Sequence, residues 1–170
     1  MALLPLKRLE SSQTFQHIGI DYLGPFNVSN GEIKERWIWL ITCLTIRAVA
    51  LKVVSEVSGQ AFPNTYKRFT ARRGKPKTVV SDNGTQFKAA AEKLRADWTF
   101  ITPHAMWKGG IYERIIGLFR TALRKTVAKK LLTVEELLTI TTKIETFSTC
   151  DQLPQLTTTR MTYCVIRVVV

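Results

Sequence analysis

Cysteine and histidine are scarce in this sequence of 170 residues. The three cysteines, Cys43, Cys150 and Cys164, lie far apart, and the two histidines are His17 and His104. Because the sequence contains no CxxC pair, we expect no zinc site of the finger type. Three widely separated cysteines also do not provide a disulfide framework, which favours a reducing compartment.

Long apolar runs are missing as well. The first ten residues contain too short an apolar stretch for a signal peptide. The apolar stretch at residues 165–170 is far shorter than a membrane span and is interrupted by Arg167. We therefore expect no membrane partner. Internal repeats and low-complexity linkers are also absent, and a chain of this length fits one domain.

Acidic residues are few relative to basic ones. The sequence has 25 Lys and Arg against 13 Asp and Glu, a formal net charge of +12, while its hydrophobic fraction of 45% is ordinary for a globular protein. An excess of this size attracts polyanions and speeds encounters with them. Nucleic acid is therefore the expected partner, the alternative being a soluble protein that is merely basic.

The pattern of apolar residues predicts three strands followed by alternating helices and strands. This order predicts a mixed sheet, with the first three strands antiparallel and helices on its faces. Gly24-Pro25 should end the first strand. Pro63 either starts the first helix or distorts its first turn. Strands are expected at residues 15–22, 37–46, 48–54, 78–81 and 98–101, and helices at residues 58–72, 87–95, 112–130 and 133–147, the last with a capping box at Thr133 and Glu136.

Aspartate occurs at four positions, and two of them, Asp21 and Asp82, end predicted strands. In open sheets, sites form at the carboxyl ends of strands. Either aspartate alone is more simply interpreted as a turn former or a helix cap. Because two aspartates occupy such positions, a shared functional site is as well supported by the sequence as a purely structural role.

Glu113 is a third candidate acid, at the start of the most strongly patterned helix. A glutamate there is also expected from the helix dipole alone. At about 100° per residue, however, Gly117, Arg120 and Arg124 lie close to the line of Glu113. This face of the helix therefore suits a metal ligand followed by a row of phosphate-binding residues. The alternative is a solvated face whose arginines pair with nearby acids.

The three acids match the needs of phosphoryl transfer. Hard divalent cations require several carboxylate oxygens in a compact site. Two such cations, about 3.5–4 Å apart, activate the attacking oxygen and stabilise the leaving oxygen of an in-line displacement. Oxygen ligands favour Mg²⁺ or Mn²⁺ over softer ions.

Four sequence motifs occur in an order that resembles the integrases of Bel/Pao-type long-terminal-repeat retrotransposons. The resemblance covers roughly residues 13–147. The motifs are FQHIGIDYLGP at residues 15–25, TCLTIRAV at residues 42–49, RFTARRGKP at residues 68–76 leading into SDNGTQF at residues 81–87, and WKGGIYER at residues 107–114.

This resemblance implies a ribonuclease-H-like fold: a mixed five-stranded sheet, with three antiparallel strands first, flanked by helices. It also implies that Asp21, Asp82 and Glu113 are the catalytic triad and hold two Mg²⁺ or Mn²⁺ ions. The implied reaction is 3′-end processing of element DNA followed by strand transfer into target DNA. The implied partners are double-stranded DNA and further copies of the chain, in the nucleus after a cytoplasmic stage. The residues expected to bind DNA are Arg114, Arg120, Arg124, Lys125, Lys129 and Lys130.

The sequence departs from the family pattern at two places. Residues 83–112, which separate the second and third acids, form a shorter spacer than is usual in the family. Residues 148–170 match no segment of related chains, as in a decayed or frame-shifted terminus. We therefore expect an extended lead-in at residues 1–12, the catalytic core at residues 13–147 and an atypical segment at residues 148–170. The alternatives are an inactive retroelement remnant that binds DNA or a partner, and a ribonuclease-H-type nuclease.

Overall fold

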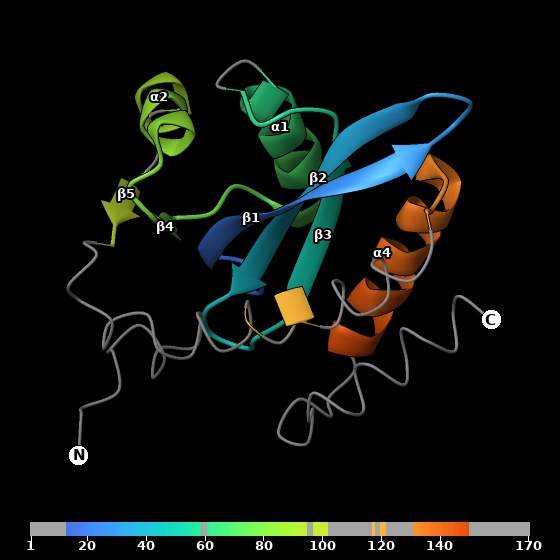
Figure 1. Ribbon diagram of the computed structural model, residues 1–170. Coiled ribbons are helices and arrows are strands. Elements are labelled where there is room, and N and C mark those ends of the chain that lie inside the picture. The colour runs from blue at the N-terminus through green and yellow to red at the C-terminus, as the bar shows by residue number, and fades with distance from the viewer. Residues whose placement is uncertain are drawn as a thin grey trace.

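One mixed sheet, in the order β3-β2-β1-β4-β5, forms the centre of the fold in the computed structural model (Figure 1). The structure describes residues 13–58, 61–94, 97–101, 117, 120, 121 and 131–149. The strands are β1 (His17–Ser29), β2 (Ile33–Cys43), β3 (Val49–Val54), β4 (Thr78–Ser81) and β5 (Asp97–Phe100), and the helices are α1 (Ala61–Arg73), α2 (Thr85–Leu94) and α4 (Val134–Thr149).

The strand directions confirm the expected sheet. β1 pairs antiparallel with β2, and β2 pairs antiparallel with β3. β1 then pairs parallel with β4, and β4 pairs parallel with β5. Three antiparallel strands followed by two parallel ones make the ribonuclease-H-like arrangement expected from the sequence. The helix predicted at residues 112–130 lies almost wholly outside the described residues.

The prediction that Gly24-Pro25 ends the first strand is wrong. β1 continues to Ser29, and its pairing with β2 shifts register between Leu23 and Phe26. A bulge tolerates a proline because a residue left out of the ladder needs no N–H there. β2 correspondingly begins at Ile33 rather than at residue 37.

Gly24 is required at this bulge for two reasons. Its φ is +136°, which side-chain-bearing residues rarely adopt. A Cβ there would lie 3.1 Å from the Trp37 ring and 3.2 Å from the Arg36 carbonyl oxygen. The bulge therefore depends on close approach of the two strand backbones.

The first turn of α1 contains Pro63. The helix begins at Ala61, whose N–H donates to Ser58 Oγ at 3.1 Å. Pro63 thus lies within the first four helical residues, whose N–H groups have no partner inside the helix. The alternative of a helix starting at Pro63 itself is not observed.

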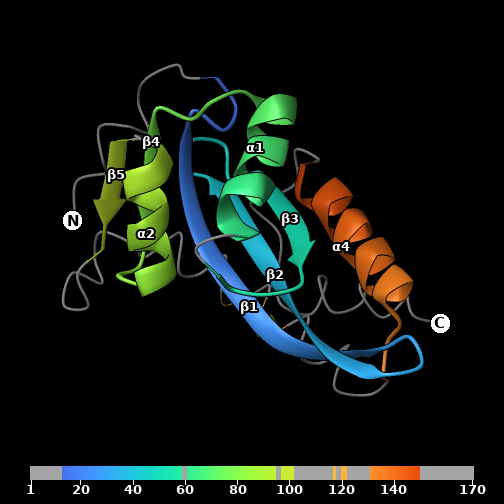
Figure 2. The same cartoon turned by 90° about the horizontal axis from the view of Figure 1, so that it is seen from above.

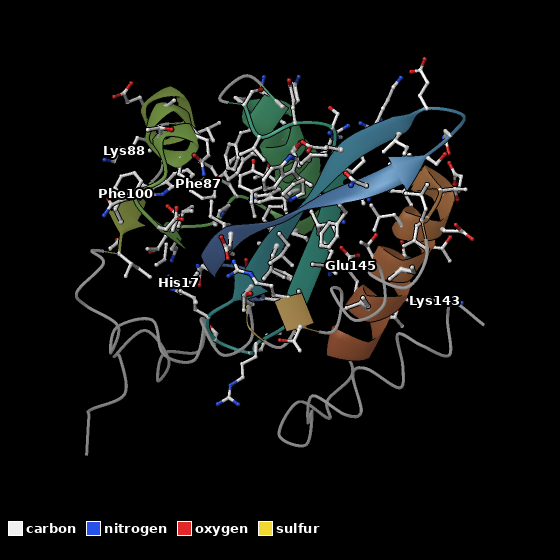
Figure 3. All side chains as sticks on the ribbon, viewed as in Figure 1. His17, Phe87, Lys88, Phe100, Lys143 and Glu145 are labelled. Atoms are coloured by element: carbon white, nitrogen blue, oxygen red, sulfur yellow. The ribbon has the colours of Figure 1, made fainter. Side chains whose placement is uncertain are left out.

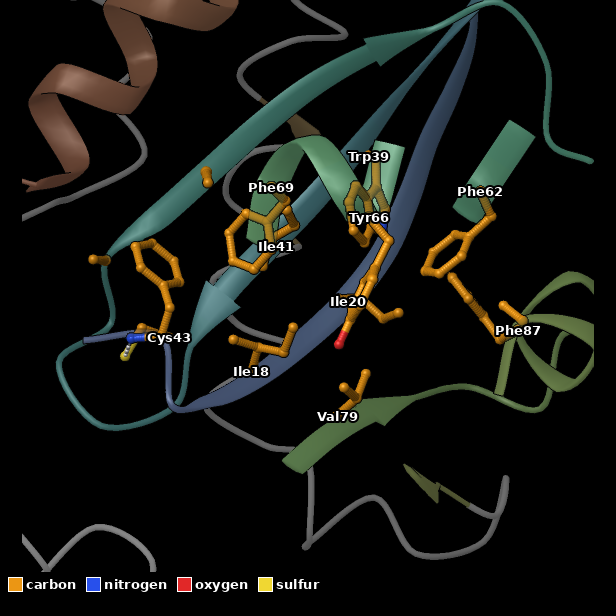
Figure 4. Packing of buried hydrophobic residues seen from close by; sticks show 14 residues of the cluster. Ile18, Ile20, Trp39, Ile41, Cys43, Phe62, Tyr66, Phe69, Val79 and Phe87 are labelled. Atoms are coloured by element: carbon orange, nitrogen blue, oxygen red, sulfur yellow. Dashed lines mark hydrogen bonds between the residues drawn. The ribbon is translucent and has the colours of Figure 1, made fainter. Parts of the chain in front are cut away.

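α1 and α2 cover one face of the sheet, and aromatic rings fill the space between (Figures 1 and 4). Phe62, Phe69 and Phe87 from these helices are buried with Trp39 of β2. The Trp39 and Phe62 ring centroids lie 4.9 Å apart in an edge-to-face arrangement, a favourable geometry for aromatic pairs. Trp39 therefore serves sheet packing, and Cys43 is buried in the same cluster.

α4 lies on the side of the sheet away from α1 and α2 (Figure 1), alongside β3 (Figure 2). The predicted capping box is confirmed: the Thr133 N–H donates to Glu136 Oε2 at 2.8 Å, and the Glu136 N–H donates to Thr133 Oγ1 at 3.1 Å. The start of α4 is fixed to the end of β1, because the Ser29 N–H donates to the Leu132 carbonyl at 2.9 Å. Leu137, Ile140 and Ile144 of α4 are buried.

Candidate active site

The register between β1 and β4 relates Asp21, the fifth residue of β1, to Asp82, the residue that follows β4, so the prediction that Asp21 ends its strand is wrong. His17 pairs with Thr78, and Gly19 pairs with Val80. Continued two residues further, this register places Asp21 opposite Asp82. Adjacent strands lie about 4.8 Å apart, and paired residues present their side chains to the same face. Continued in this way, the register puts the two carboxylates on one face at the carboxyl end of β4, and the Asp82 carboxylate is close enough to raise the pKa of Asp21.

Asp21 points away from the aromatic core. The next residue, Tyr22, stacks on Phe87 of α2 with centroids 5.3 Å apart, and side chains alternate between faces along a strand. The Asp21 side chain is 18% exposed. Its Oδ1 accepts a hydrogen bond from the Tyr22 N–H at 2.8 Å, and its Oδ2 accepts one from Arg120 Nη2 at 3.2 Å.

The groups around Asp21 have opposing effects on the pKa of its carboxyl group. Burial raises the pKa of its carboxyl group above the usual value, and the Asp82 carboxylate raises it further. The Tyr22 N–H and the Arg120 guanidinium act in the opposite direction, and the net result is a raised pKa. Without a cation, the ionised form of Asp21 is thus disfavoured.

Asp82 is exposed and sits in a tightly held turn. Its Oδ1 accepts a hydrogen bond from the Gly84 N–H at 3.0 Å. On one side, Asn83 Nδ2 donates to the Ile101 carbonyl at 3.2 Å. On the other, Trp98 Nε1 donates to the buried Ser81 Oγ at 2.8 Å. Trp98 of β5 and Ile101, which follows β5, therefore fix the position from which Asp82 projects.

Arg120 is the member of the predicted DNA-binding set that the structure describes. It is exposed and forms an ion pair with Asp21. This contact places its part of the chain beside the first aspartate, although its partner differs from the phosphate predicted for it. Gly117, predicted on the same helix face, is exposed and would leave an added Cβ free of contacts within 4 Å. The remaining predicted site residues lie outside the described residues: Glu113, Arg114, Arg124, Lys125, Lys129 and Lys130.

The donor set fits a hard divalent cation. Asp21 and Asp82 supply carboxylate oxygens, which Mg²⁺ and Mn²⁺ prefer. Their mutual repulsion is relieved by a cation between them. Within the described residues, no three His, Cys, Asp or Glu side chains form a group that could hold a metal ion. These two aspartates are therefore the described part of the candidate metal site.

Two contacts at this site were missed by sequence reasoning. The Trp98–Ser81 hydrogen bond links residues 17 apart, and the Arg120–Asp21 pair links residues 99 apart. No local sequence pattern signals either one. For the Trp98–Ser81 hydrogen bond, the presence of a tryptophan on a short edge strand was the one signal in the sequence.

Comparison with known proteins gives matches among solved structures. No protein-family model matches the chain, and no curated protein does. A chain of the simian T-cell lymphotropic virus intasome, solved in complex with PP2A regulatory subunit B56 gamma, superposes with a TM-score of 0.52 at 15% identity, over 91% of this chain and 48% of that one. This protein thus shares that fold and spans about half the length of the intasome chain.

Two structures of the HTLV-2 integrase catalytic core domain in complex with magnesium are less similar. The trimeric form gives a TM-score of 0.46 at 11% identity, over 91% of this chain and 84% of that one. The dimeric form gives a TM-score of 0.47 at 10% identity, over 92% of this chain and 87% of that one.

In the part of the chain that the structure describes, no helix combines the length and apolarity needed to cross a membrane.

Proposed function

We propose that this chain is an integrase catalytic core that carries out metal-dependent 3′-end processing of DNA and strand transfer. The observation that supports this most strongly is the closeness of Asp21 and Asp82, whose carboxylates interact electrostatically, with Arg120 bonded to Asp21. The fold shared with the intasome chain agrees with it. The four motifs point to an integrase of the Bel/Pao type.

Asp21, Asp82 and Glu113 would hold Mg²⁺ or Mn²⁺. When bound, two such ions activate the attacking oxygen and stabilise the leaving oxygen of an in-line displacement. The Ser81–Trp98 and Asn83–Ile101 hydrogen bonds hold Asp82 in place for ligation. Arg120, once released from Asp21, is positioned to bind a phosphate of the DNA backbone.

The wider proposal concerns the whole protein. Residues 13–147 would form the catalytic core, preceded by a lead-in and followed by an atypical segment at residues 148–170. The substrates would be the ends of the element and a target duplex. The chain would act as a homo-oligomer in the nucleus after a cytoplasmic stage.

A strand-transfer assay tests the function. Asp82→Asn should abolish joining of a duplex end to target DNA in Mg²⁺ or Mn²⁺ while keeping the fold, since it removes one ligand charge and hardly changes shape. Asp97→Asn is the matched control, because Asp97 is also exposed but starts β5 at the other end of β4. Normal joining by Asp82→Asn would exclude Asp82 as a ligand.

The same preparations separate the alternatives. A wild-type chain that binds DNA but joins none would be the inactive remnant. A wild-type chain that cleaves the RNA strand of an RNA–DNA hybrid and joins no DNA would be a ribonuclease-H-type nuclease.

A further inference from the structure

A dense group of exposed cations lies at the end of the sheet where β1 and β4 begin. We call it the basic end surface and define it as Arg47, Arg72, Arg73, Lys75 and Lys77, all of them exposed. They come from separate segments: the β2–β3 turn, the last turn of α1 and the connection to β4. Neither the acidic site nor the predicted DNA-binding helix includes any of them.

Contacts around residues 15–17 show that these segments are neighbours. The Lys77 N–H donates to the Gln16 carbonyl at 2.8 Å. The Leu44 N–H, in the β2–β3 turn, donates to the His17 carbonyl at 2.9 Å. The Arg73 guanidinium carbon lies 5.3 Å from the centroid of the Phe15 ring. The start of β1 thus connects the turn containing Arg47 to the cations that follow α1.

The basic end surface is at the opposite end of the β1–β4 pair from the two aspartates. His17, labelled in Figure 3, opens β1. Asp21 lies four residues further along, about 13 Å at the rise of a strand. β4 likewise runs from Thr78, next to Lys77, to Ser81, next to Asp82. The two surfaces are therefore separate.

The charges of this surface are not neutralised within the described part of the chain. The ion pairs among the described residues are Lys34–Glu32, Lys52–Glu145 and Arg120–Asp21, and none of them involves a cation of the basic end surface. One acid, Asp97, borders the surface, because it pairs in register with Thr78. α1 has no acidic residue in its first turn and ends on Arg72 and Arg73.

The helix dipole explains only part of this surface. Cations in a last helical turn are stabilising by about 0.3–1 kcal/mol, which accounts for Arg72 and Arg73. It does not account for Arg47, which belongs to a turn, or for Lys75 and Lys77, which follow Gly74. Exposed cations that come from three segments, whose backbones are held by hydrogen bonds, suit contact with the phosphates of a nucleic-acid backbone.

We propose that the basic end surface is a second DNA-binding surface, which contacts the phosphodiester backbone of duplex DNA without reading its sequence. Arginine and lysine side chains there bind phosphate oxygens, and the Phe15 ring holds the Arg73 guanidinium in place. The contact needs no metal ion. It also does not require the chain to be catalytically active, so it extends beyond the proposed function.

Salt-dependent DNA binding tests the proposal. The full chain is titrated with a random-sequence DNA duplex at several NaCl concentrations, in EDTA. The triple variant Arg47→Gln, Lys75→Gln, Lys77→Gln should bind at least tenfold more weakly at low salt. Its slope of log affinity against log salt should fall by about one unit for each phosphate that the variant no longer binds.

The matched control is Lys34→Gln, Lys88→Gln, Lys143→Gln. These lysines are exposed on the β1–β2 hairpin, α2 and α4, and their removal changes the net charge equally. The control should keep the wild-type slope to within about one unit. Equal losses in both variants would show a diffuse effect of net charge and overturn the proposal, as would a wild-type slope in the first variant.

A charge-retaining variant excludes misfolding as the cause. Arg47→Lys, Lys75→Arg, Lys77→Arg should restore the wild-type slope if phosphates are the ligand, because the cations remain. Failure to restore it, with an unchanged melting temperature, would overturn phosphate binding. Since all titrations omit metal, they are independent of the strand-transfer test of Asp82.

Discussion

Arg120 donates a hydrogen bond from Nη2 to Oδ2 of Asp21 at 3.2 Å, across 99 residues of sequence. A fixed positive charge thus occupies an oxygen that the proposed function assigns to a divalent cation. On the proposed function, arginine and metal ion would compete for the same carboxylate. The affinity for the metal would then be reduced by the free energy needed to break this pair.

Removal of the competing charge should therefore strengthen metal binding. Exposed ion pairs contribute about 0.2–1 kcal/mol, and the Arg120 side chain is 49% exposed. Arg120→Gln should then lower the Kd for Mn²⁺ by up to about fivefold in isothermal titration calorimetry. Arg72→Gln, which removes the same charge far from Asp21, is the control. An unchanged or higher Kd in Arg120→Gln would show that the pair does not compete with the metal.

The pH dependence of stability should reveal the buried charge of Asp21. Its pKa is raised in the folded state above 3.8, chiefly by burial. At pH values between the pKa of Asp21 in the unfolded state and its higher pKa in the folded state, the folded state binds more protons than the unfolded state. The free energy of unfolding therefore falls as pH rises through this range. In EDTA, Asp21→Asn should lose this fall, and its stability relative to wild type should increase from about pH 4 upward.

Urea denaturation at a series of pH values measures this difference. Asp97→Asn is the control, since Asp97 is an exposed carboxylate at the other end of the sheet. A stability difference that shrinks as pH rises would mean that the fold favours the ionised form of Asp21. The balance between burial and the Arg120 pair would then be the reverse of that inferred above.

The elements that sequence patterns predicted well are those set by local residues. The capping box at Thr133 and Glu136 acts within one helical turn, and the structure shows both of its hydrogen bonds. β3 was predicted from residue 48 and begins at Val49, because its apolar run is bounded by turn residues. The mixed sheet followed from the order of such elements.

The elements that were missed depend on contacts distant in sequence. β1 continues past Gly24-Pro25 because the bulge packs against Trp37 on another strand. The position of Asp82 at the end of a strand was visible in the sequence, whereas Asp21 lies inside β1. The register that relates them was not visible, because it is set by the pairing of His17 with Thr78. The partner of Arg120 was equally invisible.

Substitution of Gly24 should measure how far the bulge depends on close packing. Gly24→Ala should destabilise the fold by about 1–3 kcal/mol, since it adds backbone strain at positive φ and a Cβ at 3.1 Å from Trp37. Gly31→Ala is the matched control: Gly31 also has positive φ, but an added Cβ there has no neighbour within 4 Å. Urea denaturation should show the larger loss for Gly24→Ala, and equal losses would remove the role of packing at the bulge.

The Trp98–Ser81 hydrogen bond should act on metal binding through the position of Asp82. Trp98→Phe keeps an aromatic ring in contact with Phe87 but removes the Nε1 donor to the buried Ser81 Oγ. The missing hydrogen bond should cost about 0.5–1.5 kcal/mol of stability. It also frees the residue that precedes Asp82, so the Kd for Mn²⁺ should rise severalfold.

Phe100→Leu separates positioning from packing at the same strand. Phe100 stacks on Trp98 and packs against the same core, but its side chain has no group that could donate a hydrogen bond to Ser81. This variant should lose stability while keeping the wild-type Kd for Mn²⁺, measured well below its melting temperature. If both variants weaken metal binding in proportion to their loss of stability, β5 supports the acidic site only through general packing. If Trp98→Phe alone weakens it, Trp98 is a positioning residue for Asp82.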